Sequence, residues 1–139
     1  MKEVFDFIKR TKVFHFATVD QEGRPHVRPF SGCILLDGQI HFFTTNYKKV
    51  YEQIQHNPWI ELSSHDPMSH EWMRLSGRVV WDDDPRVWEA MAAARRARVA
   101  AGKAKQESVV PPESKVYFHL EQTRAEFHGT GRETRVVEF

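Results

Sequence analysis

The 139-residue sequence predicts a mainly β protein, an antiparallel barrel or sandwich flanked by about three helices. Six or seven segments rich in Val, Phe, Thr and Trp alternate with turn signals, of which Asp37-Gly38 is the clearest hairpin turn. Strand–helix–strand alternation is rare, which argues against a parallel sheet. A chain of this length buries roughly two-thirds of the surface that it exposes when unfolded, so we expect one domain over residues 1–139.

Three helices and seven strands are expected from the spacing of apolar residues. Val4, Phe5 and Ile8 recur at helical spacing near the N-terminus, as do Val50 and Ile54 near the middle of the chain. The expected helices lie at residues 2–11, 47–56 and 86–103. The expected strands lie at residues 13–19, 25–36, 39–45, 59–64, 72–81, 115–128 and 133–139. We expect the first three strands to form a meander.

Proline and aspartate residues mark where several of these elements begin and end. Pro25 and Pro29 cannot donate to a strand ladder, so their strand must lie at a sheet edge or beside a bulge. Asn57-Pro58 ends the second helix, because a residue before proline avoids the α region. The run from Asp82 to Pro85 favours the start of the third helix, whose basic residues we interpret mainly as a solvated face.

The composition excludes several classes of protein. Twenty Lys and Arg residues against 19 Asp and Glu give a net charge of +1, without the basic excess of a general nucleic-acid binder. No apolar run of about 18 residues and no signal-peptide pattern occurs, so we expect a cytoplasmic protein that does not span a membrane. Ten Phe, four Trp and eight His residues require either a large core or a planar ligand.

The histidines and the single cysteine show no catalytic or metal-binding pattern. His65 and His70 share one loop without the i, i+4 spacing or the cysteine partners of a zinc site, so we expect no metal. Cys33 follows a glycine in an apolar strand, where it fits a small buried hydrophobe better than a nucleophile.

Residues 42–49 are the most informative stretch, because a strand runs there into a helix. Thr44 and Thr45 supply hydroxyls, Asn46 is a typical N-cap, and Lys48 and Lys49 supply positive charge. Together with the free N–H groups of a helix N-terminus, these groups suit a phosphate dianion. The alternative is a pair of ordinary strand threonines followed by an ordinary cap and solvated lysines.

A second candidate stretch, residues 24–32, is expected beside the strand at 39–45. In that arrangement Arg28 would point at the same anion as Lys48. The alternative is an edge strand that proline and arginine protect from aggregation.

The order of several short motifs resembles that of the FMN-binding split-barrel proteins, the relatives of pyridoxamine 5'-phosphate oxidase. The motifs are, in chain order, Phe14-His15-Phe16-Ala17-Thr18-Val19, Gly23-Arg24-Pro25, Val27-Arg28-Pro29-Phe30, Phe43-Thr44-Thr45, Lys48-Lys49-Val50, Asn57-Pro58 and Glu71-Trp72-Met73-Arg74-Leu75-Ser76-Gly77. The resemblance covers nearly the whole chain and is strongest to the short stand-alone members of the family.

This resemblance implies a fold and a set of cofactor-binding residues. The fold would be a six-stranded antiparallel split β-barrel of Greek-key type, and a homodimer would hold FMN in the groove between its protomers. The isoalloxazine and ribityl chain would be lined by Arg28, Pro29, Phe30 and Ser31. The ribityl phosphate would be contacted by Phe43, Thr44, Thr45 and Lys48, or Lys49 in its place. From the partner protomer the flavin would be approached by Trp72 and Arg74.

The resemblance also implies an FMN-dependent oxidoreductase of a small molecule, for which NAD(P)H is a conceivable electron donor. Because some compact relatives are linked to nitroimidazole resistance, nitro-aromatic or quinone acceptors fit this expectation. The oxidase that makes pyridoxal phosphate carries Arg and Trp residues near its C-terminus, whereas residues 131–137 hold no Trp here, so that reaction is not expected.

Two alternatives stay open. One is a flavin-binding or sensing protein without turnover. The other is a split barrel that binds a deazaflavin or haem, with a strand histidine as the haem ligand; the candidates are His15, His26, His41 and His119.

Overall fold

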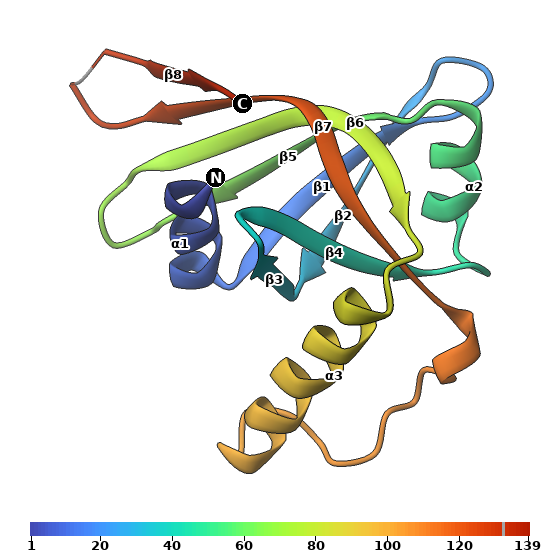
Figure 1. Ribbon diagram of the computed structural model, residues 1–139. Coiled ribbons are helices and arrows are strands. Elements are labelled where there is room, and N and C mark those ends of the chain that lie inside the picture. Colours follow the sequence, from blue (N-terminus) through green and yellow to red (C-terminus); the bar gives the residue numbers. More distant parts are fainter. Residues whose placement is uncertain (132) are drawn as a thin grey trace.

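The computed structural model describes residues 1–131 and 133–139 as one curled antiparallel sheet with three helices (Figure 1). The helices are α1 (Lys2–Thr11), α2 (Lys49–His56) and α3 (Pro85–Ala100), with a short 3-10 turn at Pro112–Ser114. The strands are β1 (Val13–Val19), β2 (Pro25–Ser31), β3 (Cys33–Leu36), β4 (Gln39–Thr45), β5 (Trp59–His65), β6 (Trp72–Asp82), β7 (Lys115–His128) and β8 (Arg135–Glu138). The prediction of a mainly β, antiparallel half-closed barrel is confirmed.

The strand order is β2-β1-β5-β6-β7-β4-β3, with β8 paired to β7. The sheet therefore has eight strands where the resemblance implied six. Gly32, with φ at 88°, accounts for one of them, because its left-handed backbone divides the expected strand 25–36 into β2 and β3. The short β8, which pairs only with β7, adds the other.

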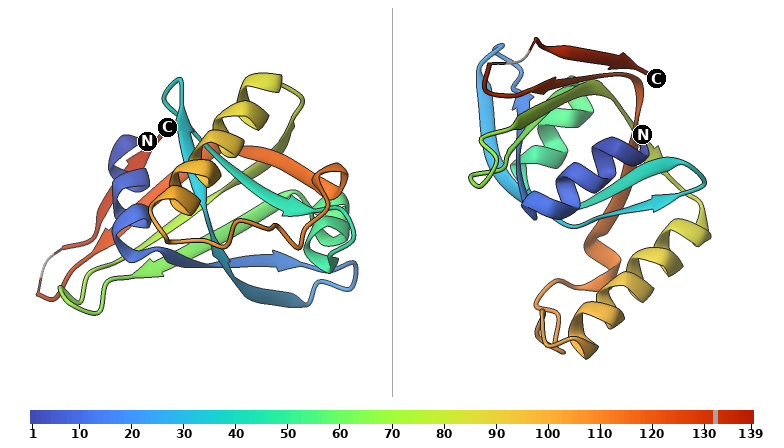
Figure 2. Two further views of the ribbon diagram at one scale, coloured as in Figure 1. Left: turned by 90° about the horizontal axis from the view of Figure 1, so that it is seen from below. Right: turned by 90° about the vertical axis from the view of Figure 1, so that its left-hand side faces the viewer.

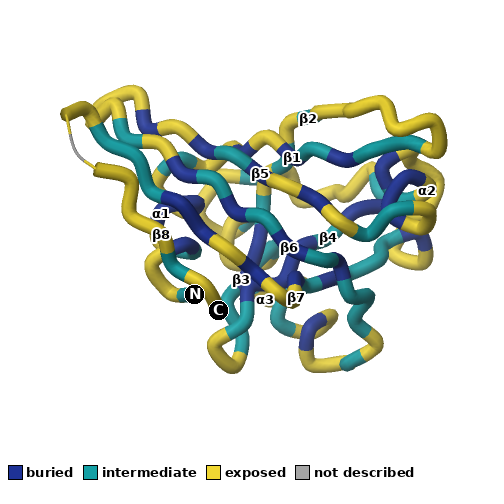
Figure 3. The backbone as a smooth tube through the Cα atoms, turned by 90° about the horizontal axis from the view of Figure 1, so that it is seen from above, coloured by how far each residue is buried: buried dark blue, intermediate teal, exposed yellow. Residues whose placement is uncertain are grey.

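The expected meander of the first three strands is confirmed in part: both of its hairpins form, but they lie at opposite ends of the sheet. β2 pairs with β1 at one end of the sheet, whereas β4 pairs with β3 and β7 at the other end. Residues 24–31 are therefore not hydrogen-bonded neighbours of β4. The turn at Gly32 carries the chain from the first hairpin to the second. The edge position predicted for β2 from Pro25 and Pro29 is confirmed, and Figure 3 shows how exposed this strand is.

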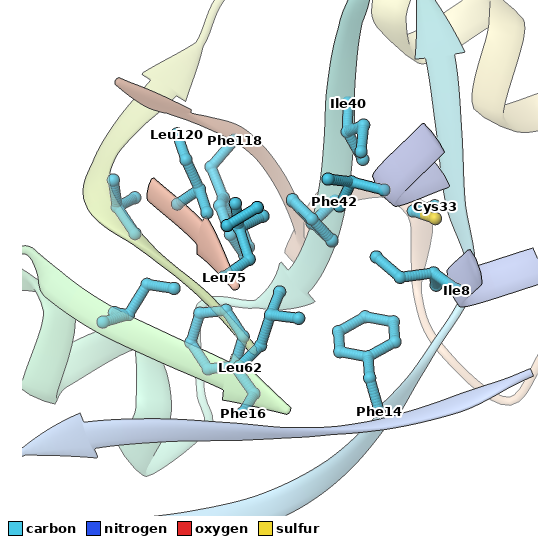
Figure 4. Packing of buried hydrophobic residues seen from close by; sticks show 14 of the residues in the cluster. Ile8, Phe14, Phe16, Cys33, Ile40, Phe42, Leu62, Leu75, Phe118 and Leu120 are labelled. Carbon is cyan, nitrogen blue, oxygen red and sulfur yellow. The ribbon is translucent and has the colours of Figure 1, made fainter. Parts of the chain in front are cut away.

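The core is built around phenylalanine rings from three strands (Figure 4). Phe14 of β1, Phe42 of β4 and Phe118 of β7 are fully buried. The ring centroids of Phe42 and Phe118 lie 5.4 Å apart, and those of Phe14 and Phe42 lie 5.6 Å apart. Ile8 of α1 packs against the same cluster. Much of the aromatic surplus of the sequence therefore fills the interior of the barrel.

The longest ladder of the sheet, β6 with β7, is bent by a bulge. Ser76 pairs with Arg124, but Arg78 pairs with Glu121, so two residues of β7 oppose the single residue Gly77. A Cβ atom on Gly77 would lie 2.9 Å from Cγ2 of Thr123, a distance that Cβ atoms in proteins essentially never show, so a larger residue would force its neighbours to move. Because a bulge increases twist and bends its strand, this register shift helps to curl the sheet.

The helices contact the sheet to different extents (Figure 2). α1 lies against β1, β3 and β5, and α2 lies against β1 and β4. Of the residues of α3, Val87 is the one that is buried, and the helix extends away from the barrel. This agrees with the solvated helix face that the sequence predicted. None of the described helices has both the length and the apolar character needed to cross a bilayer.

The close contacts of Gly77 lead to a stability prediction. Gly77→Ala should lower the free energy of unfolding by about 1–3 kcal/mol, because the added methyl group must displace Thr123 and the β7 backbone. Urea denaturation monitored by circular dichroism measures this change. Ser76→Ala, in the same strand, adds no atoms and should change stability much less; equal effects of the two substitutions would contradict the steric argument.

Candidate functional site

Two buried hydroxyl groups lie at the end of β4. The side-chain oxygens of Thr44 and Thr45 are buried, and neither has a hydrogen-bond partner among the described residues. Buried polar atoms are nearly always hydrogen-bonded, so each such exception requires an explanation. Strand alternation places Thr44 on the inward face with Phe42, and Thr45 on the outward face with Phe43. This end of the strand thus offers hydrogen-bonding capacity that the fold itself does not use.

The N-terminus of α2 follows directly and has no side-chain cap. The N-cap residue is Lys48, not the expected Asn46, and the helix begins at Lys49 instead of Tyr47. The backbone N–H of Asn46 is bonded to the carbonyl oxygen of Ser114, which holds Asn46 outside the helix. The first amides of an uncapped helix favour an anion. Lys48 and Lys49 are exposed, and neither forms an ion pair with a described residue.

Phe43 connects this strand end to the turn between β2 and β3. The ring is half-buried, and a Cβ atom on Gly32 would lie 3.4 Å from its Cε1 atom. Its other neighbour is Tyr117, at a centroid distance of 6.5 Å. Ser31, next to Gly32, is exposed. The structure therefore brings Ser31 near Phe43 through the Gly32 turn, although β2 and β4 are not paired.

The sequence predicted that Arg28 points to the N-terminus of α2. In the structure its side chain instead binds the middle of that helix. Its guanidinium donates hydrogen bonds to Oε1 of Gln53 at 2.7 Å and to Oγ1 of Thr18 at 2.7 Å. These acceptors are neutral, and partial burial lowers the pKa of Arg28. Gln53 lies one turn beyond Lys49. Arg28 therefore joins β2, β1 and α2, and its positive charge has no carboxylate partner among the described residues.

The other two residues expected from β2 differ in environment. Phe30 stacks on Phe16, with centroids 4.6 Å apart and ring planes 8° apart, so this ring packs against the core. Pro29 is exposed. The backbone of this strand remains available to a ligand, whereas the Phe30 ring is largely committed to packing.

Trp72 and Arg74 lie at the end of β6 that is remote from the residues expected on β4. Across the sheet, Arg74 lies in register with Ser63, His15 and Pro29, so it is three strands, or about 14 Å, from Pro29. β6 has eleven residues from Trp72 to Asp82, which spans roughly 33 Å at about 3.3 Å per residue. Asp82 is the end that neighbours Tyr117 and, through it, Phe43. Trp72 therefore lies at the far end of β6 from Phe43, whereas Arg74 shares a row of the sheet with Pro29.

An ion-pair network surrounds Trp72 and Arg74. Arg74 lies 2.7 Å from Oε2 of Glu126, whose other oxygen lies 2.8 Å from Arg124. The hydrogen bond from Arg74 is the largest of the causes that lower the pKa of Glu126. Trp72 stacks on His128, with ring centroids 3.8 Å apart and planes 2° apart. Both expected flavin contacts therefore already have partners within their own chain.

A cavity of about 770 Å³ opens at this end of the molecule, away from Thr44 and Thr45. Its lining includes Trp72, Phe127, Arg10 and Arg135. The two arginines are paired with carboxylates of other residues. Among the residues expected to hold FMN, Trp72 is the one that lines this cavity.

Sequence reasoning missed two groups that the structure assembles. One is the pair Thr18 and Gln53 around Arg28, and the other is a cluster of His41, Asp82 and His119. Their members lie on different elements, so no sequence spacing signals them. Each group becomes visible only when the folded sheet brings its members together.

Comparisons with known proteins support the fold and the family. The family model described as pyridoxamine 5'-phosphate oxidase matches residues 1–127. A solved structure of a NimC/NimA family protein from Clostridium acetobutylicum is 25% identical, with a TM-score of 0.84 over 100% of this chain and 92% of that one. No curated protein gave a match.

Two further solved structures share the fold at lower identity. A pyridoxamine 5'-phosphate oxidase-related, FMN-binding protein from Nostoc punctiforme is 17% identical, with a TM-score of 0.69 over 99% of this chain and 95% of that one. A heme-binding protein from Mycobacterium smegmatis is 19% identical, with a TM-score of 0.68 over 95% of this chain and 55% of that one.

The lowered pKa of Glu126 predicts a pH dependence of stability. A carboxyl group whose pKa is lowered by folding stabilises the protein above its unfolded pKa, and this contribution is lost as the pH falls through the folded pKa. Glu126→Gln should therefore be less stable than wild type at pH 7, and the difference should shrink below about pH 4.3, the ordinary value for Glu. Thermal unfolding at a series of pH values measures this.

Glu61→Gln is the matched control for that experiment. Glu61 also faces Arg74, but at 3.7 Å and with half of its side chain exposed. Its substitution should have a smaller effect at pH 7. A difference between Glu126→Gln and wild type that stays constant with pH would contradict the electrostatic explanation.

Proposed function

The chain belongs to the pyridoxamine 5'-phosphate oxidase family, and from this premise we propose that it is an FMN-dependent oxidoreductase acting on a small molecule. The main support for this proposal is the arrangement at the end of β4. Two buried hydroxyls without partners among the described residues lie there beside the uncapped N-terminus of α2 and two lysines that form no described ion pair. These groups fit a phosphate monoester, which requires several hydrogen-bond donors and positive charge.

The phosphate of FMN would be held by the hydroxyl of Thr45, the first amides of α2 and Lys48, with Lys49 as the alternative cation. The Thr44 side chain faces the interior of the barrel, so its hydroxyl would have to approach the phosphate from the side of α2. Arg28 adds positive charge one turn away and positions α2 through Gln53. Because its guanidinium is already bonded to the protein, we assign Arg28 to positioning the helix rather than to direct phosphate contact.

The flavin ring would lie beside Phe43 and the exposed backbone of residues 29–31. Pro29 and Ser31 are exposed on this edge strand, and the half-buried Phe43 ring offers an apolar contact. FMN, when bound, accepts and donates electrons through its isoalloxazine ring. The part of the protein is to bind and orient this ring and to shape access for the substrate.

A homodimer would complete the site. Trp72 and Arg74 lie at the far end of β6 from Phe43, so we assign their flavin contacts to a partner protomer. The exposed part of the Trp72 indole is available for that contact, whereas Arg74 would act mainly by holding Glu126. NAD(P)H is the proposed electron donor, with a nitro-aromatic compound, a quinone or oxygen as acceptor. The expected location is the cytoplasm.

The absorption spectrum of the purified protein tests the cofactor. A flavin spectrum, with FMN released on denaturation, supports the proposal. A Soret band would indicate haem instead, and a protein that ignores added FMN but binds a deazaflavin would indicate that cofactor. Oxidation of NADH or NADPH by the FMN-loaded protein then separates an oxidoreductase from a flavin-binding or sensing protein.

The lysine pair can be tested by FMN titration. Lys48→Ala combined with Lys49→Ala should weaken FMN affinity at least about tenfold, or about 1.4 kcal/mol, because charge-assisted contacts to the phosphate are lost. Fluorescence quenching of FMN measures the affinity. Lys103→Ala combined with Lys105→Ala removes the same charge beyond α3 and should leave it unchanged. Equal affinities of both double variants would place the phosphate elsewhere.

Thr45→Val separates ligand binding from folding. The Thr45 hydroxyl has no partner among the described residues, so its replacement by an isosteric methyl group should leave the stability of the FMN-free protein equal or higher. FMN affinity should fall by more than about tenfold, since a hydrogen bond to a charged group contributes about 1.5–3 kcal/mol.

Thr18→Val is the matched control for Thr45→Val. The Thr18 hydroxyl is bonded to Arg28 and Gln53, so its loss should lower the stability of the FMN-free protein. Thermal unfolding without FMN and FMN titration measure the two effects. A Thr45→Val variant that binds FMN as tightly as wild type would remove this hydroxyl from the site.

A further inference from the structure

Three side chains from three neighbouring strands meet outside the core. Nδ1 of His41 on β4 lies 2.8 Å from Oδ2 of Asp82 at the end of β6, and Nδ1 of His119 on β7 lies 2.7 Å from Oδ1 of the same carboxylate. One ligand atom from each residue lies within 4.8 Å of the other two. The side chains of His41 and Asp82 are 10% and 6% exposed, and that of His119 is 22% exposed.

The surroundings of Asp82 are short of positive charge. Both carboxylate oxygens of Asp82 lie within hydrogen-bond distance of an imidazole nitrogen, and this side chain is 6% exposed. No Lys or Arg among the described residues is paired with this nearly buried carboxylate. Isolated buried charges are costly, so this cluster favours a cation.

The charged residues around the cluster do not supply that cation. Arg86 is paired with Asp84 and Asp37, and Arg78 is paired with Glu121, whose other oxygen lies 3.9 Å from Nε2 of His119. These neighbours comprise three carboxylates and two guanidinium groups, so they carry no excess of positive charge. Asp82 has no described ion-pair partner apart from the two imidazoles.

We propose that His41, Asp82 and His119 form a binding site for a divalent transition-metal ion of the Zn²⁺ type. Two imidazoles and one carboxylate are a common ligand set for such ions, and they leave further positions for water or another ligand. The proton of each neutral imidazole moves to Nε2 when Nδ1 binds the ion. Ligand atoms at about 2.0–2.1 Å from a tetrahedral Zn²⁺ lie about 3.4 Å apart, and those of the cluster lie within 4.8 Å of one another, so they must close by up to about 1.4 Å.

A small cavity gives access to this site. It has a volume of about 190 Å³ and is lined by residues that include His41, Asp82, Asp84 and Arg86. An ion could therefore enter from the side of α3 without opening the hydrophobic core, and it would join β4, β6 and β7 where they meet that helix.

Zn²⁺ binding to the chelator-treated protein tests the proposal directly. Competition with a chromophoric chelator should show one Zn²⁺ per chain, and the thermal unfolding midpoint should rise with Zn²⁺ concentration because the ion binds the folded state. Co²⁺ in place of Zn²⁺ should give visible d–d absorption. None of these measurements depends on FMN, so failure of the proposed flavin site would not affect them.

Variants identify the ligands. Asp82→Asn and His119→Gln should each weaken Zn²⁺ binding more than about tenfold. A tenfold loss of affinity is usual even when the substituted residue only hydrogen-bonds to a metal ligand, and these residues are ligands themselves. His119→Gln changes the most exposed member and guards against a variant that fails to fold, which circular dichroism without metal would detect. His65→Gln removes an exposed imidazole elsewhere and should bind Zn²⁺ like wild type.

Two outcomes would overturn the metal site. Wild-type protein that takes up no Zn²⁺ would show that the cluster is a hydrogen-bonded link between strands only. Zn²⁺ uptake that is equal in wild type and in a folded His119→Gln variant would place the ion on other surface groups.

Discussion

The bend in the β6–β7 ladder is the constraint on which the rest of the structure depends. These are the two longest strands, and they pair over nearly their whole length except at Gly77. Because the ladder curls there, the β1/β2 hairpin on one side and the β3/β4 hairpin on the other wrap around one phenylalanine core. A side chain at Gly77 would hold β7 away from β6, so the close approach of the two backbones at the bulge depends on a glycine there.

The same ladder determines which functional groups can meet. Its two ends lie roughly 33 Å apart along β6, with Trp72 at one end and Asp82 at the other. The proposed phosphate site and the His41–Asp82–His119 cluster are both near the Asp82 end, and His41, Phe43 and Thr45 alternate along the outward face of β4. A flavin ring and a metal ion, if both bind, would share this face of the strand. In the proposed homodimer, the Trp72 end would take part from the second copy.

The local elements were largely predictable, because their signals lie within a few residues. The range of α1 and the ranges of β1, β4 and β7 agree with the apolar spacing, and the prolines of β2 indicated an edge strand. Pairing between distant strands was not predictable in the same way. Both hairpins of the expected meander form, but one positive-φ residue, Gly32, sends β3 to the opposite end of the sheet, and nothing in the apolar pattern of residues 25–36 marks that change of partner.

The fold class, the family and the stretch from Thr44 to Lys49 could be recognised from the order of residues, because a strand, two hydroxyls and a helix start are contiguous in that stretch. The folded chain was needed to show that both hydroxyls are buried without a described partner, that Lys48 and not Asn46 precedes the helix, and that Arg28 is bound to Gln53. It alone assembled His41, Asp82 and His119. The physical reason is that hydrogen bonding and burial depend on contacts between strands far apart in the chain, which local spacing does not encode.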